Sequence, residues 1–436
     1  MGEQNARPHV VVVGGGFAGI AAVHALRRAD VDITLIDRHT YNTFQPLLYQ
    51  VATASLNPGD ITWFLRALQA GQRNVRFLKG AVVAMDHDTR CVQLSSGVRV
   101  EYDQLIIAVG VTTNFFGVPG AAEHSLPLYR RSQALRVRDE MFAQLEDAAV
   151  NASERDLRII VVGGGATGVE TAGAFAELRN MDMPTTYPEL DPARTHITLV
   201  EMLPHVLGPF HPKLRDYARK ALEKRGVDLR LDTAVKEVRE DGVVVEHDGE
   251  QEFLESRIVV WASGVTAHDI VKGWGVPQGR GGRIEVDEHQ RVRGLSDVYA
   301  VGDVGVDPDA PLPQQAQPAI QGGKHVAKVI QAGLEGREVK PFKYRDKGTM
   351  ATVGRSSAVA QISHLPRLRG LLAWLIWVFL HIAMLLSNRN RFATLTNLAA
   401  RYLTKGSHNV IVGEVPDPKA RRRMVVKGSG RDRSRP

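Results

Sequence analysis

Two glycine-rich turns are the first residues in this sequence whose types and spacing could do chemistry. Gly14-x-Gly16-x-x-Gly19 and Gly163-x-Gly165-x-x-Gly168 share one spacing. In such a turn the first glycine permits a tight bend, the second lets the backbone approach a pyrophosphate, and the third lets a helix pack closely on a strand. Free N–H groups and the dipole at the helix N-terminus then stabilise the phosphate charge. The repeat predicts two dinucleotide sites.

An acidic residue ends the strand expected after each turn. Asp37 follows the first turn and Glu201 the second, and both are placed to accept hydrogen bonds from ribose hydroxyls. A carboxylate at Glu201 also repels a 2′-phosphate, and no Arg follows directly. The second site is therefore expected to prefer NADH over NADPH.

Strands and a helix must position each turn. Apolar segments 9–13 and 32–37 are predicted strands around a helix at 18–28, and strands 157–162 and 196–201 around a helix at 168–178 repeat the pattern. Segment 180–194, with three prolines, is expected to be a loop insertion. A single glycine motif could be a bare loop, but two in β-α-β context predict an α/β fold with two Rossmann-like domains.

Cysteine usage excludes several kinds of site. Cys91 is the single cysteine of the 436 residues, so the chain can form no intrachain disulfide, no dithiol centre and no cysteine-based metal site. Cys91 itself is expected to be a small buried hydrophobe. We expect no metal.

The C-terminal part is basic. From Lys347 to the end there are sixteen Lys or Arg and three acids, although the net charge of the whole chain is +7. Such a region favours an anionic surface, either nucleic acid or lipid. The N-terminus has no signal-peptide pattern, so a cytoplasmic protein is expected.

An apolar run at 371–386 lies within this basic region. As a helix it would reach about 24 Å, short of the roughly 30 Å of a hydrocarbon core, which favours an interfacial helix over a spanning one. Trp374 and Trp377 suit a headgroup boundary, and Phe392 and Leu395 begin a second amphipathic stretch. The alternative is a buried core or dimer helix.

The order of these pieces resembles the two-dinucleotide-binding-domain flavoprotein reductases. Across nearly the whole chain the sequence is similar to the type II NADH:quinone oxidoreductases, also called alternative or non-proton-pumping NADH dehydrogenases. The resemblance is carried by segment 41–53 after the first acid, Leu-Ser-Asp-Val-Tyr-Ala-Val-Gly-Asp at 295–303, Ala-Gln-Pro-Ala-Ile-Gln at 316–321, and the ending at 374–404. One departure is Val109, where many relatives have Thr.

The resemblance implies a membrane-peripheral flavoenzyme that oxidises NADH and reduces a membrane quinone through FAD, without proton pumping. It places Glu170 beside the nicotinamide and flavin rings, and assigns Gln317 and Gln321, four apart on one helix face, to the quinone carbonyls. The structural alternatives are an acid that complements a helix N-terminus and glutamines that cap or bond within the core.

The same resemblance and the two glycine motifs define the cofactor sites. Non-covalent FAD is expected at Gly14, Gly16, Phe17, Ala18, Gly19, Asp37, Arg38, Gln45, Ala108, Gly110, Gly302, Asp303 (which would bind the ribityl chain), Ala316 and Gln317. NADH is expected at Gly163, Gly165, Thr167, Gly168, Glu170, Glu201, Ser263 and Gly264.

The expected organisation follows. The FAD domain is discontinuous, at 1–118 and 281–340, the NADH domain occupies 119–280, a cap with membrane-binding helices 341–415, and a flexible basic tail 416–436. Expected partners are NADH, a membrane quinone and an anionic membrane surface on the cytoplasmic face, with a homodimer through the C-terminal helices and no nucleic acid.

Two other functions remain open at this point. One is a soluble ferredoxin- or rubredoxin-type reductase, which would not need the apolar C-terminal helices. The other is a non-enzymatic flavoprotein that binds nucleic acid or a partner through its basic end.

Overall fold

A computed structural model describes residues 7–150, 156–363 and 365–403, so the expected basic tail lies outside the described residues. Contacts divide the chain into two compact units. The first is made of Met1–Thr43, Thr62–Asn114 and Gly264–Lys347, and the second of Phe44–Ile61, Phe115–Ser263 and Gly348–Pro436. These units depart from the expected domain boundaries mainly at 44–61 and 264–280. Contacts alone do not assign a cofactor to a unit, so the domain assignment stays a prediction.

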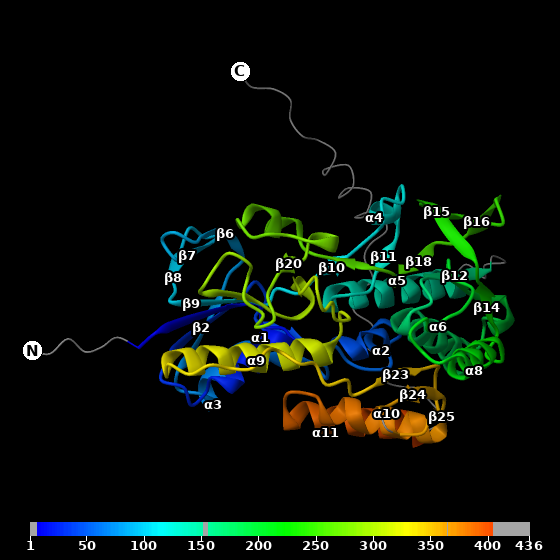
Figure 1. Ribbon diagram of the computed structural model, residues 1–436. Coiled ribbons are helices and arrows are strands. Elements are labelled where there is room, and N and C mark those ends of the chain that lie inside the picture. Colours follow the sequence, from blue (N-terminus) through cyan, green and yellow to red (C-terminus); the bar gives the residue numbers. More distant parts are fainter. Residues whose placement is uncertain (1–6, 151–155, 364, 404–436) are drawn as a thin grey trace, which may run out of the picture. The chain divides into compact units, whose positions relative to one another are not determined.

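The first unit is built on a five-stranded parallel sheet (Figure 1). Its strand order is β21 (Val298–Ala300), β9 (Gln104–Ile107), β1 (His9–Val13), β2 (Asp32–Asp37) and β5 (Val75–Lys79). Helix α1 (Phe17–Ala25) connects β1 to β2. The first β-α-β element is therefore as predicted.

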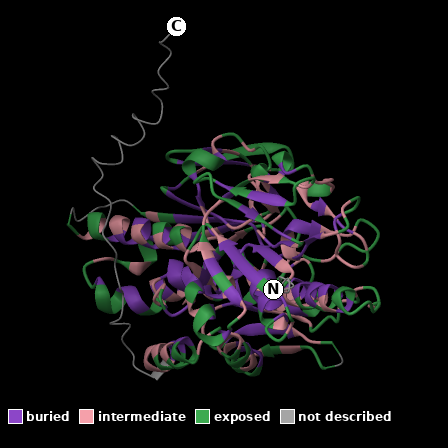
Figure 2. Cartoon of the chain, turned by 90° about the vertical axis from the view of Figure 1, so that its left-hand side faces the viewer, coloured by how far each residue is buried: buried purple, intermediate pink, exposed green. Residues whose placement is uncertain are grey.

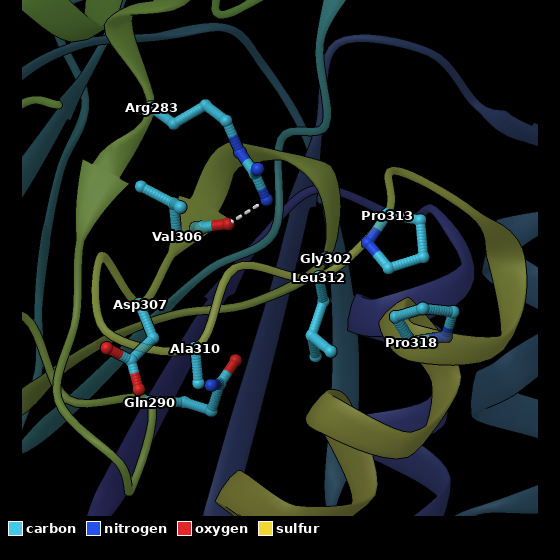
Figure 3. A pocket seen from close by; sticks show the side chains of 10 residues that line it. Arg283, Gln290, Gly302, Val306, Asp307, Ala310, Leu312, Pro313 and Pro318 are labelled. Atoms are coloured by element: carbon cyan, nitrogen blue, oxygen red, sulfur yellow. Dashed lines mark hydrogen bonds between the residues drawn. The ribbon is translucent and has the colours of Figure 1, made fainter. Parts of the chain in front are cut away.

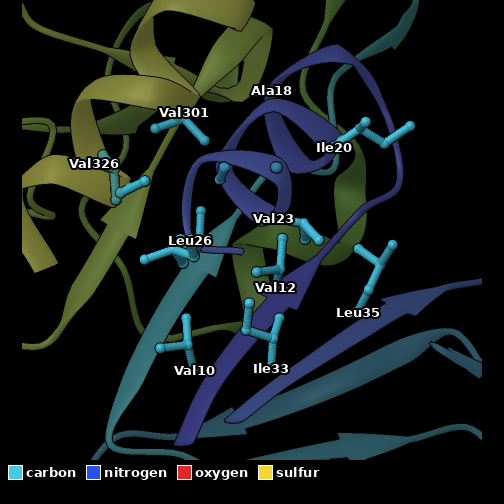
Figure 4. Close-up of a cluster of buried hydrophobic side chains, with 14 of the residues drawn as sticks. Val10, Val12, Ala18, Ile20, Val23, Leu26, Ile33, Leu35, Val301 and Val326 are labelled. Atoms are coloured by element: carbon cyan, nitrogen blue, oxygen red, sulfur yellow. The ribbon is translucent and has the colours of Figure 1, made fainter. Parts of the chain in front are cut away.

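Both faces of this sheet are covered. Val10 and Val12 of β1 pack with α1 and with α9 (Ala316–Leu334), as Figure 4 shows for Val10, Val12, Val23 and Val326. The alternate residues, Val11 and Val13, join a second cluster. This cluster includes residues of an antiparallel sheet of β6 (Val82–Asp86), β7 (Cys91–Leu94) and β8 (Arg99–Glu101). A continuous apolar strand is what burial on both faces of a parallel sheet requires.

Smaller elements complete the first unit. Cys91 is 3% exposed, as expected of a small buried hydrophobe. The remaining strand pairs are β3 (Tyr41–Thr43) with β4 (Thr62–Phe64), β10 (Thr112–Thr113) with β19 (Val265–Thr266), and β20 (Ile284–Glu285) with β22 (Gly305–Val306).

The second unit repeats the architecture. Its parallel sheet has the order β11 (Leu126–Pro127), β18 (Ile258–Trp261), β12 (Leu157–Val162), β13 (Thr195–Val200) and β14 (Val227–Arg230). Helix α6 (Ala166–Glu177) follows β12, and α8 (Pro212–Glu223) connects β13 to β14. In Figure 2 the strands are largely purple, meaning buried. The α/β fold with two Rossmann-like sheets is confirmed.

Further elements of the second unit surround this sheet. They are α2 (Leu48–Ala52), α4 (Ala121–His124), α5 (Arg131–Val150) and an antiparallel sheet of β15 (Thr233–Arg239), β16 (Gly242–His247) and β17 (Glu250–Glu255). The expected loop at 180–194 is in part wrong. A π-helical turn continues α6 over Leu178–Asp182, and α7 (Met183–Thr186) follows with Pro184 in its first turn, where the absent N–H costs nothing.

The C-terminal part of the second unit is a small sheet with two helices. Strands β23 (Thr349–Thr352), β24 (Ala358–Gln361) and β25 (Leu368–Gly370) are antiparallel, and α10 (Leu371–Ala383) and α11 (Asn388–Leu403) follow (Figure 1). Among the described residues, no helix combines the length and the apolar character needed to cross a membrane.

The predicted headgroup role of the two tryptophans is wrong. Trp374 is 9% and Trp377 1% exposed, because both lie on the side of α10 that faces the protein. Trp374 packs with Ala358 and Ala360 of β24. Trp377 stacks on His381 with ring centroids 4.0 Å apart. Sequence periodicity identified an apolar helix but could not tell which side of it faces inward.

Candidate functional site

The first glycine turn has the geometry that its three positions predict. Gly14 has φ +110°, and a Cβ there would lie 2.3 Å from the Ala108 oxygen. A Cβ on Gly19 would lie 1.9 Å from the Gly14 oxygen, so only glycine allows α1 to start this close to β1. A Cβ on Gly16 would lie 4.0 Å from the nearest of these neighbouring atoms, the Ala108 oxygen. Packing thus requires the first and third glycines, and the space beside the second suits a pyrophosphate.

Asp37 holds this turn from the next strand. Its Oδ2 accepts a hydrogen bond from Gly15 N at 2.6 Å, and its Oδ1 accepts one from His39 N at 2.7 Å. Burial raises the pKa of this carboxyl, while the Gly15 and His39 N–H groups oppose the rise. Each carboxylate oxygen can accept a further hydrogen bond, so the ribose role predicted for Asp37 remains compatible with these contacts.

The start of α9 lies beside the start of α1. Gly302 has φ +74°, and a Cβ there would lie 3.2 Å from Ala18 Cβ and 3.3 Å from Ala319 Cβ. A Cβ on Gly323 would lie 2.2 Å from the Ala18 oxygen. The structure therefore brings predicted FAD residues from three distant segments together at one end of the sheet.

A pocket lies at this place (Figure 3). Arg283, which the sequence analysis missed, donates from Nε to the Asp303 oxygen at 2.9 Å and from its terminal nitrogen to the Gly305 oxygen, the dashed line in Figure 3. Gln314 also donates to the Asp303 oxygen, at 3.2 Å. Neither residue lies in a recognisable spacing, so no signal could have identified them. The pocket lining consists of Arg283, Gln290, Gly302, Gly305, Val306, Asp307, Ala310, Leu312, Pro313 and Pro318.

The two predicted quinone glutamines both lie on α9. Gln321 is already engaged, because its Nε2 donates to the Arg345 oxygen and its Oε1 accepts from Arg345 N, both at 3.0 Å. These two hydrogen bonds with the Arg345 backbone attach segment 337–347 to α9. Gln317 lies in the first turn of α9, beside Pro318 of the pocket lining.

The second glycine turn reproduces the first. Gly163 has φ +109°, and a Cβ there would lie 2.9 Å from Ser263 Cβ. A Cβ on Gly168 would lie 1.8 Å from the Gly163 oxygen, whereas a Cβ on Gly165 would meet nothing within 4 Å. The residues of both turns fit the phosphates of a dinucleotide by the same criterion, an open second glycine between two packed ones.

Glu201 occupies the position of Asp37 in the second unit. Its Oε2 accepts from Gly164 N and its Oε1 accepts from Leu203 N at 2.8 Å. In both units a carboxylate thus bridges the middle of the glycine turn and the residue two positions after the acid. The same pair of backbone hydrogen bonds to a carboxylate therefore occurs in each unit.

Glu170 is a buried acid of the second unit with a strongly raised pKa. It lies on α6, is 8% exposed, and burial raises its pKa to about 8. A hydrogen bond from Thr352 N to its Oε1, 3.2 Å long, opposes the rise. Glu170 begins the second turn of α6, and a buried acid with a perturbed pKa is a candidate functional residue.

The remaining predicted site residues belong partly to the first unit and partly to the second. Gln45 belongs to the second unit, where its Nε2 donates to the Tyr129 oxygen at 3.3 Å. Ser263 is the last residue of one segment of the second unit, and Gly264, with φ +67°, is the first residue of a segment of the first unit. Phe17 and Ala18 open α1, Thr167 lies in the first turn of α6, Arg38 follows β2, Gly110 follows β9, and Ala316 opens α9.

The two C-terminal helices have an apolar side that the rest of the described chain leaves uncovered. The exposed fractions of this side are Leu371 55%, Leu372 56%, Leu375 51%, Phe379 75%, Phe392 70% and Leu395 50%. On α11 the covered side carries polar residues as well as Leu398: Thr394 is fully buried, and Asn397 donates to Asp60 Oδ2 at 2.7 Å. Arg401 pairs with Glu177 and Asp182 at 3.4 and 3.3 Å. The core-helix alternative therefore does not describe this side.

Comparisons with known proteins agree with this geometry. Residues 8–323 match the family model described as pyridine nucleotide-disulphide oxidoreductase, and 347–405 match that of the NDH2 C-terminal domain. The type II NADH:quinone oxidoreductase Ndh of Mycobacterium tuberculosis is 38% identical over 91% of this chain and 89% of its own length. That of Staphylococcus aureus is 30% identical over 83% and 91%.

Solved structures show the same fold. NDH2 from Plasmodium falciparum in complex with NADH has a TM-score of 0.86 at 19% identity and covers 94% of this chain and 100% of that one. The sulfide:quinone oxidoreductase of Aquifex aeolicus has a TM-score of 0.73 at 22% identity and covers 91% and 94%. On the identity and coverage of the curated relatives, this chain belongs to the type II NADH:quinone oxidoreductases.

Proposed function

We propose that the chain carries out the family reaction, NADH oxidation and quinone reduction through FAD, with one dinucleotide held by each unit. The first unit holds FAD at the turn of Gly14, at Asp37 and at Gly302, and the second holds NADH at the turn of Gly163 and at Glu201. Bound flavin supplies the capacity to accept a hydride and to pass on two electrons. The observation that carries this proposal is the carboxylate-bridged glycine turn, which occurs once in each unit.

Glu170 is proposed to act as a neutral acid. With a pKa of about 8 the carboxyl is mostly protonated at pH 7. A neutral carboxyl both donates and accepts, which matches the carboxamide of a nicotinamide, whereas a carboxylate only accepts. We expect flavin reduction by NADH to decline as pH rises through about 8, because the donor is lost.

The quinone is proposed to meet the start of α9. Gln317 and Gln321 are both candidates to donate to a quinone carbonyl, and the Gln321 amide is bonded at both ends to Arg345. An amide nitrogen carries two N–H groups, and the Arg345 oxygen takes one, so Gln321 retains a donor. Gln317→Ala and Gln321→Ala should therefore each weaken quinone kinetics.

The uncovered apolar side of α10 and α11 is proposed to lie on an anionic membrane. Arg367 and Arg369 precede α10, and Arg389 and Arg391 lie in the first turn of α11, where negative lipid attracts them. Because the cytoplasmic leaflet carries that charge, we place the enzyme there as a peripheral protein. A second copy of the chain could cover the same side, so the proposed homodimer competes for this surface. Nucleic acid, which lacks an apolar surface for these helices, is not the proposed partner.

The test uses purified holoprotein. NADH and NADPH oxidation are measured with and without a short-chain quinone, and binding to vesicles of anionic and neutral lipid is measured in parallel. The proposal expects quinone-dependent oxidation of NADH in preference to NADPH, and binding to anionic vesicles that salt weakens. Electron transfer to a ferredoxin but not to quinone would favour the soluble reductase instead.

A further inference from the structure

A buried polar chain leads away from Glu170 within the second unit. Thr352, the last residue of β23, donates its backbone N–H to Glu170 Oε1 at 3.2 Å. The Thr352 Oγ1 lies 3.0 Å from the Tyr49 hydroxyl, and Gln50 Nε2 donates to that hydroxyl, also at 3.0 Å. Tyr49 and Gln50 lie on α2, 303 and 302 residues before Thr352 in sequence. A long-range contact of this kind joins two elements that share no neighbouring sequence.

The direction of one of these hydrogen bonds can be assigned. Gln50 Nε2 can only donate, so the Tyr49 oxygen accepts there. In the contact between the two hydroxyl groups, either Tyr49 or Thr352 can be the donor. All three side chains are buried: Tyr49 is 6%, Gln50 5% and Thr352 2% exposed. In such surroundings a hydrogen bond is strong and an unsatisfied group is costly. The Gln50 Oε1 is buried without a hydrogen-bond partner among the described residues, so the contacts that hold this chain are those of the Gln50 Nε2 and the two hydroxyls.

We propose that Tyr49 is a positioning residue for the family reaction: its hydroxyl fixes Thr352, and Thr352 in turn presents its backbone N–H to the Glu170 carboxyl. Without the Tyr49 hydroxyl the end of β23 is free to move relative to α6, and the N–H is aligned less well with Glu170. The inference rests on the role proposed above for Glu170.

The direction of the effect follows from which form of Glu170 the N–H favours. A donor aimed at a carboxyl stabilises its charged form and therefore lowers its pKa. The Thr352 N–H opposes the large effect of burial in this way. Loosening that hydrogen bond should therefore raise the pKa of Glu170 further, and the pH at which flavin reduction declines should move upward.

Other titratable groups lie on the elements packed against α6. Tyr49 is the titratable side chain on α2, and β23 carries none. Many of the charged side chains on the other elements packed against α6 form ion pairs: Arg219 with Asp216 and Glu223, Lys220 with Asp216, Arg230 with Asp228, Arg158 and His196 with Asp156, and Arg401 with Glu177 and Asp182. Arg179 and Arg215 donate instead to backbone oxygens, and α8 also carries Lys213 and Tyr217.

The chain offers a matched control. The Tyr217 hydroxyl of α8 lies 3.0 Å from Ser357 Oγ, the same distance as in the pair of Tyr49 and Thr352. Ser357 precedes β24, so both pairs join a helix to the same hairpin of β23 and β24. Tyr217→Phe removes an equivalent hydroxyl contact without touching the residue that donates to Glu170.

The experiment is stopped-flow reduction of the bound flavin by NADH, between pH 5.5 and 9.5, in the holoenzyme. We expect Tyr49→Phe and Thr352→Val each to move the inflection of the reduction rate upward by about half a pH unit or more. The double variant should move it no further, because each single substitution already removes the same contact between the two side chains. Thr352→Ser keeps the hydroxyl and should behave as the wild type. Tyr217→Phe should leave the inflection in place.

The outcomes separate this inference from the proposed role of Glu170. If the wild type has no inflection, or Glu170→Gln retains it, the role of Glu170 fails. If Glu170→Gln abolishes it but Tyr49→Phe leaves it unmoved, or Tyr217→Phe moves it equally, the positioning role of Tyr49 is overturned. If Tyr49→Phe does not retain FAD, the comparison of Thr352→Val with Thr352→Ser decides, and equal inflections for these two overturn the inference.

Discussion

Replacing Glu170 by Gln should stabilise the protein, and increasingly so as pH rises. Glu170 is 8% exposed, and burial raises its pKa from the usual 4.5 to about 8. The unfolded chain releases this proton above about pH 4.5, whereas the folded chain keeps it until about pH 8. A raised pKa in a buried acid therefore lowers the free energy of unfolding. The loss begins as pH rises above the pKa of the group in the unfolded chain, and it is complete above the pKa in the folded chain.

The size of the effect follows from about 1.4 kcal/mol for each pKa unit. The loss is about 1 kcal/mol at pH 5.5, about 3 kcal/mol at pH 7, and levels off near about 5 kcal/mol above pH 8. A Gln side chain has no proton to release and avoids this loss. The stability advantage of Glu170→Gln should therefore grow by about 2 kcal/mol between pH 5.5 and pH 7.

Chemical denaturation of the holoprotein at a series of pH values measures this difference. The growth of the advantage with pH is the cleaner quantity, because it does not depend on how well the Gln amide is accommodated. Glu177→Gln, in the same helix, removes an acid that pairs with Arg401 and serves as the control, with no growing advantage expected. A difference between Glu170→Gln and wild type that stays constant from pH 5.5 to pH 8 would refute the reasoning.

Three further results are expected. Gly168→Ala places a Cβ 1.8 Å from the Gly163 oxygen, so flavin reduction by NADH should fall by more than about 100-fold while FAD is retained, as absorbance and stopped-flow measurements would show; unchanged reduction would contradict the packing argument. Glu201→Gln removes a charge and should reduce the preference for NADH over NADPH in steady-state kinetics by about tenfold. Leu375→Ser and Phe379→Ser, at side chains 51% and 75% exposed, should each weaken vesicle binding by about tenfold without changing NADH oxidation with a short-chain quinone; undiminished binding would exclude the proposed membrane side.

Sequence patterns predicted the fold well where backbone geometry demands particular residues. The two glycine turns and the acids Asp37 and Glu201 lie where the spacing placed them, because a left-handed φ and a close helix–strand contact permit little else. The family was also recognised correctly, from the segment around Gln317 and the C-terminal ending.

Sequence patterns did not predict the contacts between distant segments. The engagement of Gln321 with Arg345 and the contact of Thr352 with Glu170 depend on how distant elements pack, and no local spacing records it. The inward orientation of Trp377 has the same cause. An apolar helix beside a small sheet can turn either side to it, and packing against β24 and stacking on His381 decide which.

The most direct test of the central claim is an anaerobic titration of the purified holoprotein. Addition of NADH should bleach the flavin absorbance, and subsequent addition of a short-chain quinone should restore it with one quinone consumed for each NADH oxidised. Flavin that NADH does not bleach, or that stays bleached after the quinone is added, would contradict the account.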